Sequence, residues 1–503
     1  MSTQTELRTI EHVIGGAGAA GESTRTSLVW DPAAGEPQAQ VLLAEPADVD
    51  RAVKAAREAL PGWANASLAR RSKVMFRFRE LLERNVDELA RMIASEHGKV
   101  VDDAKGEIAR GLEVVEFVCG LPQLLKGEYS DEVSTGIDAH SFRQPLGVCA
   151  GITPFNFPVM VPLWMHPVAI ATGNTFILKP SERDPSPSNL IAELYHEAGL
   201  PDGVFNVVHG DKVAVDAILD HPGIAGVSFV GSTPIARYVH ERATKQGKRV
   251  QALGGAKNHA VVMPDADLDY AADQLTAAGF GSAGQRCMAI SVLVAVGDCA
   301  DPLLERLAAR AREVKVGSGL DPTSEMGPVV TAAARERIVG YIEQGVRDGA
   351  IATVDGRELE TGTGGFFVGP TLFDRASTDM SIYTDEIFGP VLTTVRVDSL
   401  DEAIELINSN SYANGTAIFT GSGQAARRFE REVNVGMIGI NVPIPVPMAY
   451  YSFGGWKDSL FGDHHIHGAE GIRFYTRAKA VTTRWPADGT GGVSRGLNFP
   501  TNA

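Results

Sequence analysis

Leu146-Gly-Val-Cys-Ala-Gly-Ile152 is a short apolar run that leads directly into the turn Thr153-Pro-Phe-Asn-Phe-Pro158. The run has the length and composition of a buried strand, and the prolines of the turn prevent the strand from continuing. Further runs of this kind, separated by segments of helical length, follow at 174–179, 204–209, 224–230 and 249–253. Apolar strands that alternate with helices indicate a parallel sheet covered on both faces, which is an α/β architecture.

Helical patterns precede this predicted sheet, and a second α/β alternation follows it. Asp48–Leu60 has apolar residues at spacings of three and four behind an acidic cap. A helical pattern then continues from Arg70 to about Leu121, with a break near Gly98. After about Gly255, a second α/β unit is predicted by apolar runs at 260–263, 291–296 and 415–419.

Length and composition indicate a multidomain globular protein. The 503 residues are too many for one hydrophobic core and predict two or three domains. A net charge of −16 argues against nucleic acids and anionic membranes as partners. The most apolar run, 157–171, carries Pro162, His166 and Pro167 and is shorter than the roughly 20 residues that span a bilayer. Four cysteines without a C-x-x-C pair indicate the reduced thiols of a cytoplasmic protein, with no disulfide or metal site.

The segment Phe280-Gly-Ser-Ala-Gly-Gln-Arg-Cys-Met288 sets a lone thiol beside an arginine in a glycine-rich turn. A thiolate is the nucleophilic form of cysteine. A cationic neighbour such as Arg286, or exposed backbone N–H groups, are expected to lower the pKa of Cys287 towards neutrality. Lone cysteines are more often buried and inert, but the two glycines and the arginine favour a nucleophile here. We therefore expect chemistry at an aldehyde or acyl carbon.

Two turns at strand ends are candidates for binding a dinucleotide, although the G-x-G-x-x-G fingerprint is absent. Phe229-Val-Gly-Ser-Thr233 follows a predicted strand and precedes a helix, so its free N–H groups can meet a pyrophosphate. Lys179-Pro-Ser-Glu182 can hold ribose hydroxyls, and its carboxylate disfavours a 2′-phosphate, which points to NAD over NADP. Alone, the first turn is more often a capped helix start and the second is as often an exposed charged turn.

Two further turns carry polar groups that could act in catalysis. Asn156 sits between two prolines, and its amide could donate to a developing oxyanion, although an isolated asparagine in a turn is more often a structural cap. Glu386-Ile-Phe-Gly-Pro390 adds a carboxylate and an aromatic ring, and its simpler interpretation is a plain loop.

These motifs, in this order, resemble the aldehyde dehydrogenase superfamily over nearly the whole chain, and above all its CoA-acylating methylmalonate-semialdehyde (malonate-semialdehyde) dehydrogenases. The segments that carry the resemblance are Pro154–Pro158, Lys179–Arg183, Gly255–His259, Ala283–Met288, Asn441–Pro447 and Gly471–Thr476. The resemblance implies that Cys287 is the nucleophile and that Asn156 and the Cys287 N–H form the oxyanion hole. It also implies an NAD site made by Thr153, Phe155, Lys179, Glu182, Arg183, Ser232, Gly254, Glu386 and Phe388.

One position distinguishes two branches of this family. Hydrolytic members carry a glutamate about 34 residues before the cysteine, where this chain has Leu253. The acylating relatives usually have asparagine and methionine where this chain has Leu253 and Gly254. Water has a pKa near 15.7 and a thiol one of about 8.5, so coenzyme A can attack a thioester without the base that water needs. A leucine here therefore favours transfer of the acyl group to CoA as co-substrate.

The resemblance implies a substrate that carries its own carboxylate, and hence a cation that binds it. Arg286 adjoins the nucleophile, and Arg110 matches the second arginine of the acylating relatives. The expected reaction is oxidation of methylmalonate or malonate semialdehyde, loss of CO2 and release of propionyl-CoA or acetyl-CoA. The sequence does not rank the two substrates or choose among valine, inositol and β-alanine breakdown.

The family also implies a homotetramer and a domain organisation. The segments 1–123 and 146–255 are expected to form the NAD-binding domain and 256–450 the catalytic domain. A small β oligomerisation flap and the C-terminal segment are expected at 124–145 and 451–486, with a mobile tail at 487–503.

Three alternative functions remain open. A dehydrogenase that releases the free acid would turn over without CoA, and Leu253 argues against it. A non-catalytic relative would be expected to lack Cys287 or Asn156, and both are present. An acylating enzyme for a neutral aldehyde would have no use for two arginines near its substrate.

Overall fold

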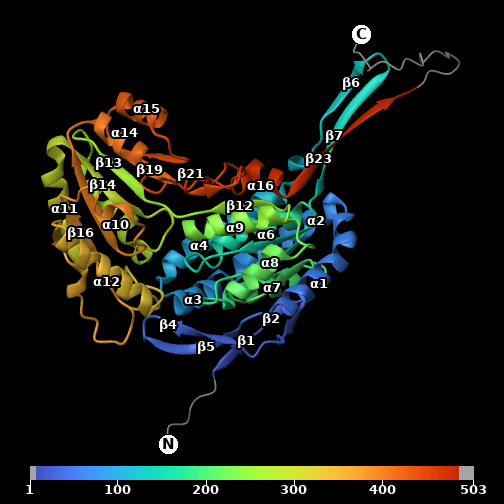
Figure 1. Cartoon of the computed structure of the whole chain (residues 1–503), viewed down its shortest axis with the longest axis horizontal. Coiled ribbons are helices and arrows are strands. Elements are labelled where there is room, and N and C mark those ends of the chain that lie inside the picture. Colours follow the sequence, from blue (N-terminus) through green and yellow to red (C-terminus); the bar gives the residue numbers. More distant parts are fainter. Residues whose placement is uncertain (1–6, 486–503) are drawn as a thin grey trace, which may run out of the picture.

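Five parallel strands form the centre of an eight-stranded sheet in the computed structural model, which describes residues 7–485 (Figure 1). All five strands predicted in the first half of the chain are present and pair in parallel: β8 (Val148–Ile152), β9 (Thr175–Lys179), β10 (Phe205–Val207), β11 (Gly226–Val230) and β12 (Arg249–Leu253). Antiparallel strands close the edges of the sheet: β2 (His12–Ile14), β3 (Ala17–Ala19) and β22 (Leu460–Phe461). The order is β22-β12-β11-β8-β9-β10-β2-β3.

Helices cover both faces of this sheet. Successive residues of a strand point to opposite faces, and in these strands both sets of side chains are mainly apolar. Val148 and Ala150 of β8 pack into one apolar cluster and Cys149 into another. The first face is covered by α1 (Pro46–Ala64), α8 (Lys212–Asp220) and α9 (Thr233–Lys245). The second face is covered by α2 (Leu68–Arg84), α3 (Val86–His97), α4 (Val101–Cys119), α5 (Leu121–Leu124), α6 (Met160–Ala171) and α7 (Ser186–Glu197).

The helix break predicted near Gly98 is confirmed. Gly98 ends α3 with a left-handed φ of 95°. A β-carbon at this position would lie 2.8 Å from Pro328 Cγ, so the turn has neither the backbone conformation nor the room for a side chain. The chain therefore changes direction here and starts α4 after a short loop that carries Lys99.

The second α/β unit is built on a seven-stranded sheet. Its order is β15-β16-β17-β14-β13-β19-β20, and only the edge strand β15 is antiparallel. The three predicted strands are present as β13 (Asn258–Val262), β14 (Ile290–Val296) and β19 (Gly415–Phe419). Sequence patterns did not indicate β15 (Ile351–Val354), β16 (Thr371–Asp374), β17 (Val391–Val397) and β20 (Met437–Ile440). The covering helices are α10 (Leu268–Phe280), α11 (Ala300–Glu313) and α12 (Ala332–Arg347) on one face, and α14 (Leu400–Ser409) and α15 (Gly423–Glu432) on the other.

A three-stranded antiparallel arm extends away from the two α/β units (Figure 1). It pairs β6 (Tyr129–Ser134) with β7 (Ile137–Pro145), and β7 with β23 (Thr476–Arg484), so segments 330 residues apart share one ribbon. Smaller elements complete the chain: β1 (Arg8–Ile10), β4 (Thr26–Asp31), β5 (Glu36–Leu42), α13 (Ser381–Thr384), β18 (Tyr412–Ala413), β21 (Trp456–Lys457) and α16 (Gly468–Phe474). The predicted tail at 487–503 lies outside the described residues.

Between residues 7 and 485, no helix has both the length and the apolar character required to cross a bilayer.

Candidate active site

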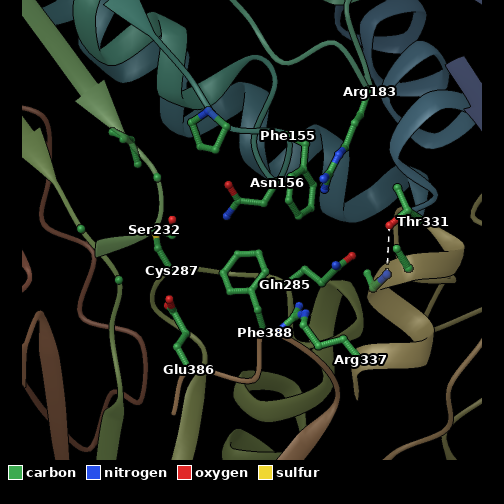
Figure 2. A pocket seen from close by; sticks show the side chains of 17 residues that line it. Phe155, Asn156, Arg183, Ser232, Gln285, Cys287, Thr331, Arg337, Glu386 and Phe388 are labelled. Carbon is green, nitrogen blue, oxygen red and sulfur yellow. Dashed lines mark hydrogen bonds between the residues drawn. The ribbon is translucent and has the colours of Figure 1, made fainter. Parts of the chain in front are cut away.

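The two sheets meet at a cavity of about 410 Å³, a volume suited to a small ligand (Figure 2). One wall comes from turns at the carboxyl ends of β8, β11 and β12, where ligands of parallel sheets bind. The opposite wall comes from the loop after α10, the start of α12 and the turn before β17. The polar or aromatic residues that line it are Phe155, Asn156, Arg183, Ser232, Gln285, Cys287, Thr331, Arg337, Glu386 and Phe388.

Cys287 reaches the cavity on a loop with an unusual backbone. Ser282 and Ala283 have positive φ angles of 53° and 52°, and Gly284 has one of 68°. A β-carbon on Gly284 would lie 2.0 Å from the carbonyl oxygen of Gly389, so the loop packs directly against the turn that carries Glu386. The side-chain amide of Asn258 donates to the Cys287 carbonyl at 2.9 Å. The position of Cys287 is therefore set by contacts with two distant segments, the Asn258 side chain and the Gly389 backbone.

The thiol of Cys287 is protonated at neutral pH in this structure. Burial, and then the Glu386 carboxylate, raise the pKa of Cys287 to about 12, against the weaker opposing effects of backbone N–H groups and Lys99. The prediction that Arg286 lowers this pKa towards neutrality is wrong. The Arg286 guanidinium turns back to α4 and pairs with Asp103 at 2.5 Å.

Asn156 lies in the turn between β8 and α6, where it is 3% exposed and lines the cavity together with Cys287 (Figure 2). Its backbone carbonyl accepts a hydrogen bond from Lys99 Nζ at 2.6 Å. The side chain that sequence reasoning selected as an oxyanion donor is thus in the same cavity as the thiol.

The position that holds a glutamate in hydrolytic relatives lies outside the cavity lining. Leu253 is the last residue of β12, is 3% exposed and belongs to an apolar cluster. It pairs with Leu460 of β22. The next residue, Gly254, does line the cavity, and a β-carbon there would lie 2.7 Å from the Asp458 carbonyl oxygen. Replacement of the methionine usual in acylating relatives by glycine therefore matches a close approach of the backbone near Asp458.

Most of the predicted cofactor residues gather in this cavity, namely Phe155, Arg183, Ser232, Gly254, Glu386 and Phe388. The Arg183 guanidinium lies 4.9 Å from the centre of the Phe155 ring. Ser232 caps α9 without a side-chain hydrogen bond to the helix. Glu386 accepts a hydrogen bond from Ala256 N at 2.9 Å, and burial raises the pKa of this carboxyl to about 7.

Three predicted cofactor residues lie at the same sheet edge but outside the cavity lining. Lys179 ends β9, and its Nζ donates to the Gly210 carbonyl at 2.8 Å. The same Nζ lies 3.5 Å from Glu182 Oε2. Thr153 follows β8, and its buried hydroxyl has no hydrogen-bond partner among the described residues. This unpaired hydroxyl is available to a ligand that reaches the edge.

The two predicted substrate arginines lie apart from the cavity lining. Arg286 is paired with Asp103, and both side chains are 19% exposed. Arg110 pairs with Glu113 on its own helix at 3.1 Å, and its Nη1 also lies 3.5 Å from Met448 Sδ. Both arginines are thus engaged with protein carboxylates.

Sequence reasoning missed several residues at the site. Arg337 lines the cavity and donates to the Ile387 carbonyl at 2.8 Å, which holds the turn of Glu386 and Phe388. Lys99 contacts the Asn156 turn from the end of α3. Neither residue stands in a motif that signals a site, because each one's role comes from a tertiary contact.

Comparisons with known proteins find relatives over nearly the whole chain. The model of the aldehyde dehydrogenase family matches residues 19–481. The chain is 57% identical over 483 residues to the malonate-semialdehyde dehydrogenase of Pseudomonas aeruginosa, covering 95% of this chain and 97% of that protein. Two solved structures each have a TM-score of 0.95 and cover 96% of this chain and 99% of their own. They are the methylmalonate-semialdehyde dehydrogenase of Oceanimonas doudoroffii, 55% identical, and a Sinorhizobium meliloti protein in complex with NAD, 54% identical.

Proposed function

The chain belongs to the aldehyde dehydrogenase family, and we propose that it is an NAD-dependent, CoA-acylating semialdehyde dehydrogenase. In this proposal, methylmalonate semialdehyde, NAD and CoA give propionyl-CoA, CO2 and NADH, and malonate semialdehyde gives acetyl-CoA in the same way. Relatives that carry these substrates in their names cover nearly the whole chain at about half identity or more, which supports the assignment.

The observation that carries CoA dependence is the burial of Leu253 in an apolar cluster. A hydrolytic enzyme needs a base for a water molecule whose pKa is near 15.7, whereas the thiol of CoA ionises near 8.5. The gap of about 7 units corresponds to roughly 10 kcal/mol in ease of ionisation. With a leucine at the position of the base, the acyl-enzyme is protected from water and left for CoA.

The chain's own groups then act as follows. Cys287, as the thiolate, adds to the aldehyde carbon, and the Asn156 amide and the Cys287 N–H stabilise the resulting oxyanion. Departure of hydride leaves a thioester on Cys287 with a β-carboxylate. Loss of CO2 gives an enolate that the same donors stabilise. After protonation, the sulfur of CoA attacks the carbonyl, the carbon–sulfur bond to Cys287 breaks, and acyl-CoA leaves.

NAD supplies the hydride acceptor when it is bound, and the cavity has features that fit it. The free N–H groups at the start of α9 suit a pyrophosphate, and so does the side chain of the N-cap residue Ser232, which makes no hydrogen bond to the helix. Gly255 leaves no room for a side chain, because a β-carbon would lie 2.4 Å from Glu386 Oε2. We assign ribose contacts to Lys179, Glu182 and Glu386, and aromatic contacts to Phe155 and Phe388.

We assign the substrate carboxylate to Arg286 and Arg110. A guanidinium binds a carboxylate through two parallel hydrogen bonds. In this structure each arginine already has a carboxylate partner, Asp103 or Glu113, so substrate binding exchanges one carboxylate for another. Such an exchange disfavours neutral aldehydes, which cannot replace the protein carboxylate.

We further propose a cytoplasmic homotetramer. All four cysteines are unpaired, which supports a reducing compartment. The arm of β6, β7 and β23 exposes Tyr129 and Phe142, and exposed aromatic residues on a projecting ribbon suit a subunit contact. Within each subunit we assign NAD binding to 1–123 with 146–255, and catalysis to 256–450.

The proposal is tested by following NADH from malonate semialdehyde with and without CoA, and by identifying the product by mass spectrometry. We expect steady turnover and acetyl-CoA only when CoA is present. Equally fast turnover without CoA, with release of free malonate or acetate, would contradict the proposal. That result would direct attention to Glu386, the carboxylate that shares the cavity with Cys287.

A further inference from the structure

A fully buried ion pair lies beneath the turn that carries Asn156. Lys99 Nζ and Glu107 Oε2 are 2.8 Å apart, and neither side chain has any exposed surface. Burying two charges is costly unless further polar contacts compensate them, so their partners show what the pair does in the fold.

Lys99 contacts one side of the turn. Its ammonium group donates to the backbone carbonyl of Asn156 at 2.6 Å and lies 4.3 Å from the centre of the Phe157 ring. These two contacts hold the peptide unit of Asn156 itself, since they reach its carbonyl and the residue that follows.

Glu107 contacts the other side of the same turn. Its Oε1 accepts hydrogen bonds from Val159 N at 2.8 Å and from Met160 N at 3.1 Å, where α6 begins. The N–H groups at a helix start have no partner within the helix, so a buried carboxylate satisfies them and fixes the end of the turn. The pair thus holds the seven-residue turn, 153–159, at its middle and at the end where α6 begins.

Burial shifts the pKa of other ionisable groups near the pair. Burial, and then Lys99, keep the pKa of His97 well below its ordinary value, and burial raises the pKa of Asp184 well above it. Burial raises the pKa of Glu96 to about 7. Burial also raises the pKa of Glu107, and the contact with Lys99 opposes this rise, so the two side chains compensate each other beneath the turn.

We propose that Lys99 and Glu107 are positioning residues for the oxyanion site, which hold the Asn156 turn so that its amide faces the reacting carbonyl. The inference rests on the proposed function only in assigning Asn156 as an oxyanion donor. It does not depend on which aldehyde is oxidised or on CoA.

The test is a double-mutant cycle on acylation of Cys287 by p-nitrophenyl acetate. In this step the thiolate attacks the ester carbonyl, the ester C–O bond breaks, and p-nitrophenolate leaves; neither NAD nor CoA is needed. We expect N156A to lower the single-turnover rate roughly 100- to 1000-fold, as for loss of one oxyanion donor. K99M should lower it on the order of 10- to 100-fold in the wild-type background, and by less than about threefold in the N156A background.

Because K99M leaves Glu107 unpaired, K99M/E107Q provides a second variant without either charge. R396M serves as the matched control, because Arg396 pairs with Asp374 near the far end of β17 and should leave the acylation rate unchanged. Equal losses from K99M with and without N156A, or a wild-type rate in K99M/E107Q, would overturn the proposal. Failure of the wild type to form acyl-CoA while the cycle gives the expected coupling would reject the proposed function and leave this inference standing.

Discussion

At the scale of single residues, the environment of a side chain decides its chemistry more than its neighbours in sequence do. Arg286 is adjacent to Cys287 in the chain, yet its guanidinium forms an ion pair with Asp103. Burial and Glu386 raise the pKa of Cys287 to about 12, so the thiol keeps its proton at pH 7. Activation therefore requires a change at the site, such as substrate or cofactor binding.

Replacing Arg286 tests its assignment to the substrate carboxylate. R286L should raise KM for malonate semialdehyde roughly 10- to 100-fold, because a hydrogen bond to a charged group contributes about 1.5–3 kcal/mol. KM for propanal, which has no carboxylate, should change little. D103N is the complementary variant: it removes the competing carboxylate and should lower KM for the semialdehyde. Equal effects of R286L on both aldehydes would remove the assignment.

Replacing Glu386 tests the cost of its burial. Its pKa is about 7 in the folded protein against 4.5 for the ordinary group, so between these values the folded state holds a proton that the unfolded state releases. The stability of the wild type therefore falls as pH rises from about 4.5 to 7, by about 3 kcal/mol from this group.

E386Q lacks this titration, and its melting temperature should gain on that of the wild type between pH 5 and pH 8. The exposed Glu58 on α1 provides the control E58Q, whose difference from the wild type should stay constant. A constant gap for E386Q as well would show that Glu386 is not buried as described.

At the scale of elements, the five central strands of the first sheet were predictable because continuous apolar runs with helices between them are a local pattern. Strands such as β16 and β20 were missed because they span four residues each, too few for a periodic signal. The cysteine loop was recognisable by its glycines, but its strained backbone follows from packing against Gly389.

Gly284 tests that packing. G284A would place a β-carbon 2.0 Å from the Gly389 carbonyl oxygen in a left-handed conformation. We expect a loss of stability of roughly 1–3 kcal/mol and displacement of Cys287, seen as slower alkylation by iodoacetamide. Gly279 in α10 is the control, since a β-carbon there would lie an ordinary 3.5 Å from the Ile290 carbonyl oxygen. G279A with a larger effect than G284A would show that the loop packs differently.

At the scale of the whole molecule, the cavity exists because two α/β units each contribute one wall. The arm lies outside both units (Figure 1). Its residue Tyr129 is 64% exposed, and Trp485, which follows β23, is 72% exposed. Apolar side chains that gather on one projecting ribbon, rather than lying singly, are typical of a contact with another chain.

The arm can be tested by charge substitution. Y129D combined with F142D should reduce the mass measured by light scattering from the four chains of the proposed tetramer to two or one, because a buried carboxylate in an apolar contact is strongly unfavourable. L320D, at a residue 49% exposed in a loop of the catalytic unit, should leave the mass unchanged. An unchanged mass for the arm variant would exclude the arm from assembly.

The sequence by itself determined the parallel sheet, the order of motifs that identifies the family, and the leucine at the position of a catalytic base. These features are local: they depend on residue type and on spacing along the chain. Only the tertiary structure decided the protonation of Cys287, the partner of Arg286 and the Lys99–Glu107 pair beneath Asn156. Each of these depends on which charges from distant segments share a region that water does not reach, where their interaction is strongest.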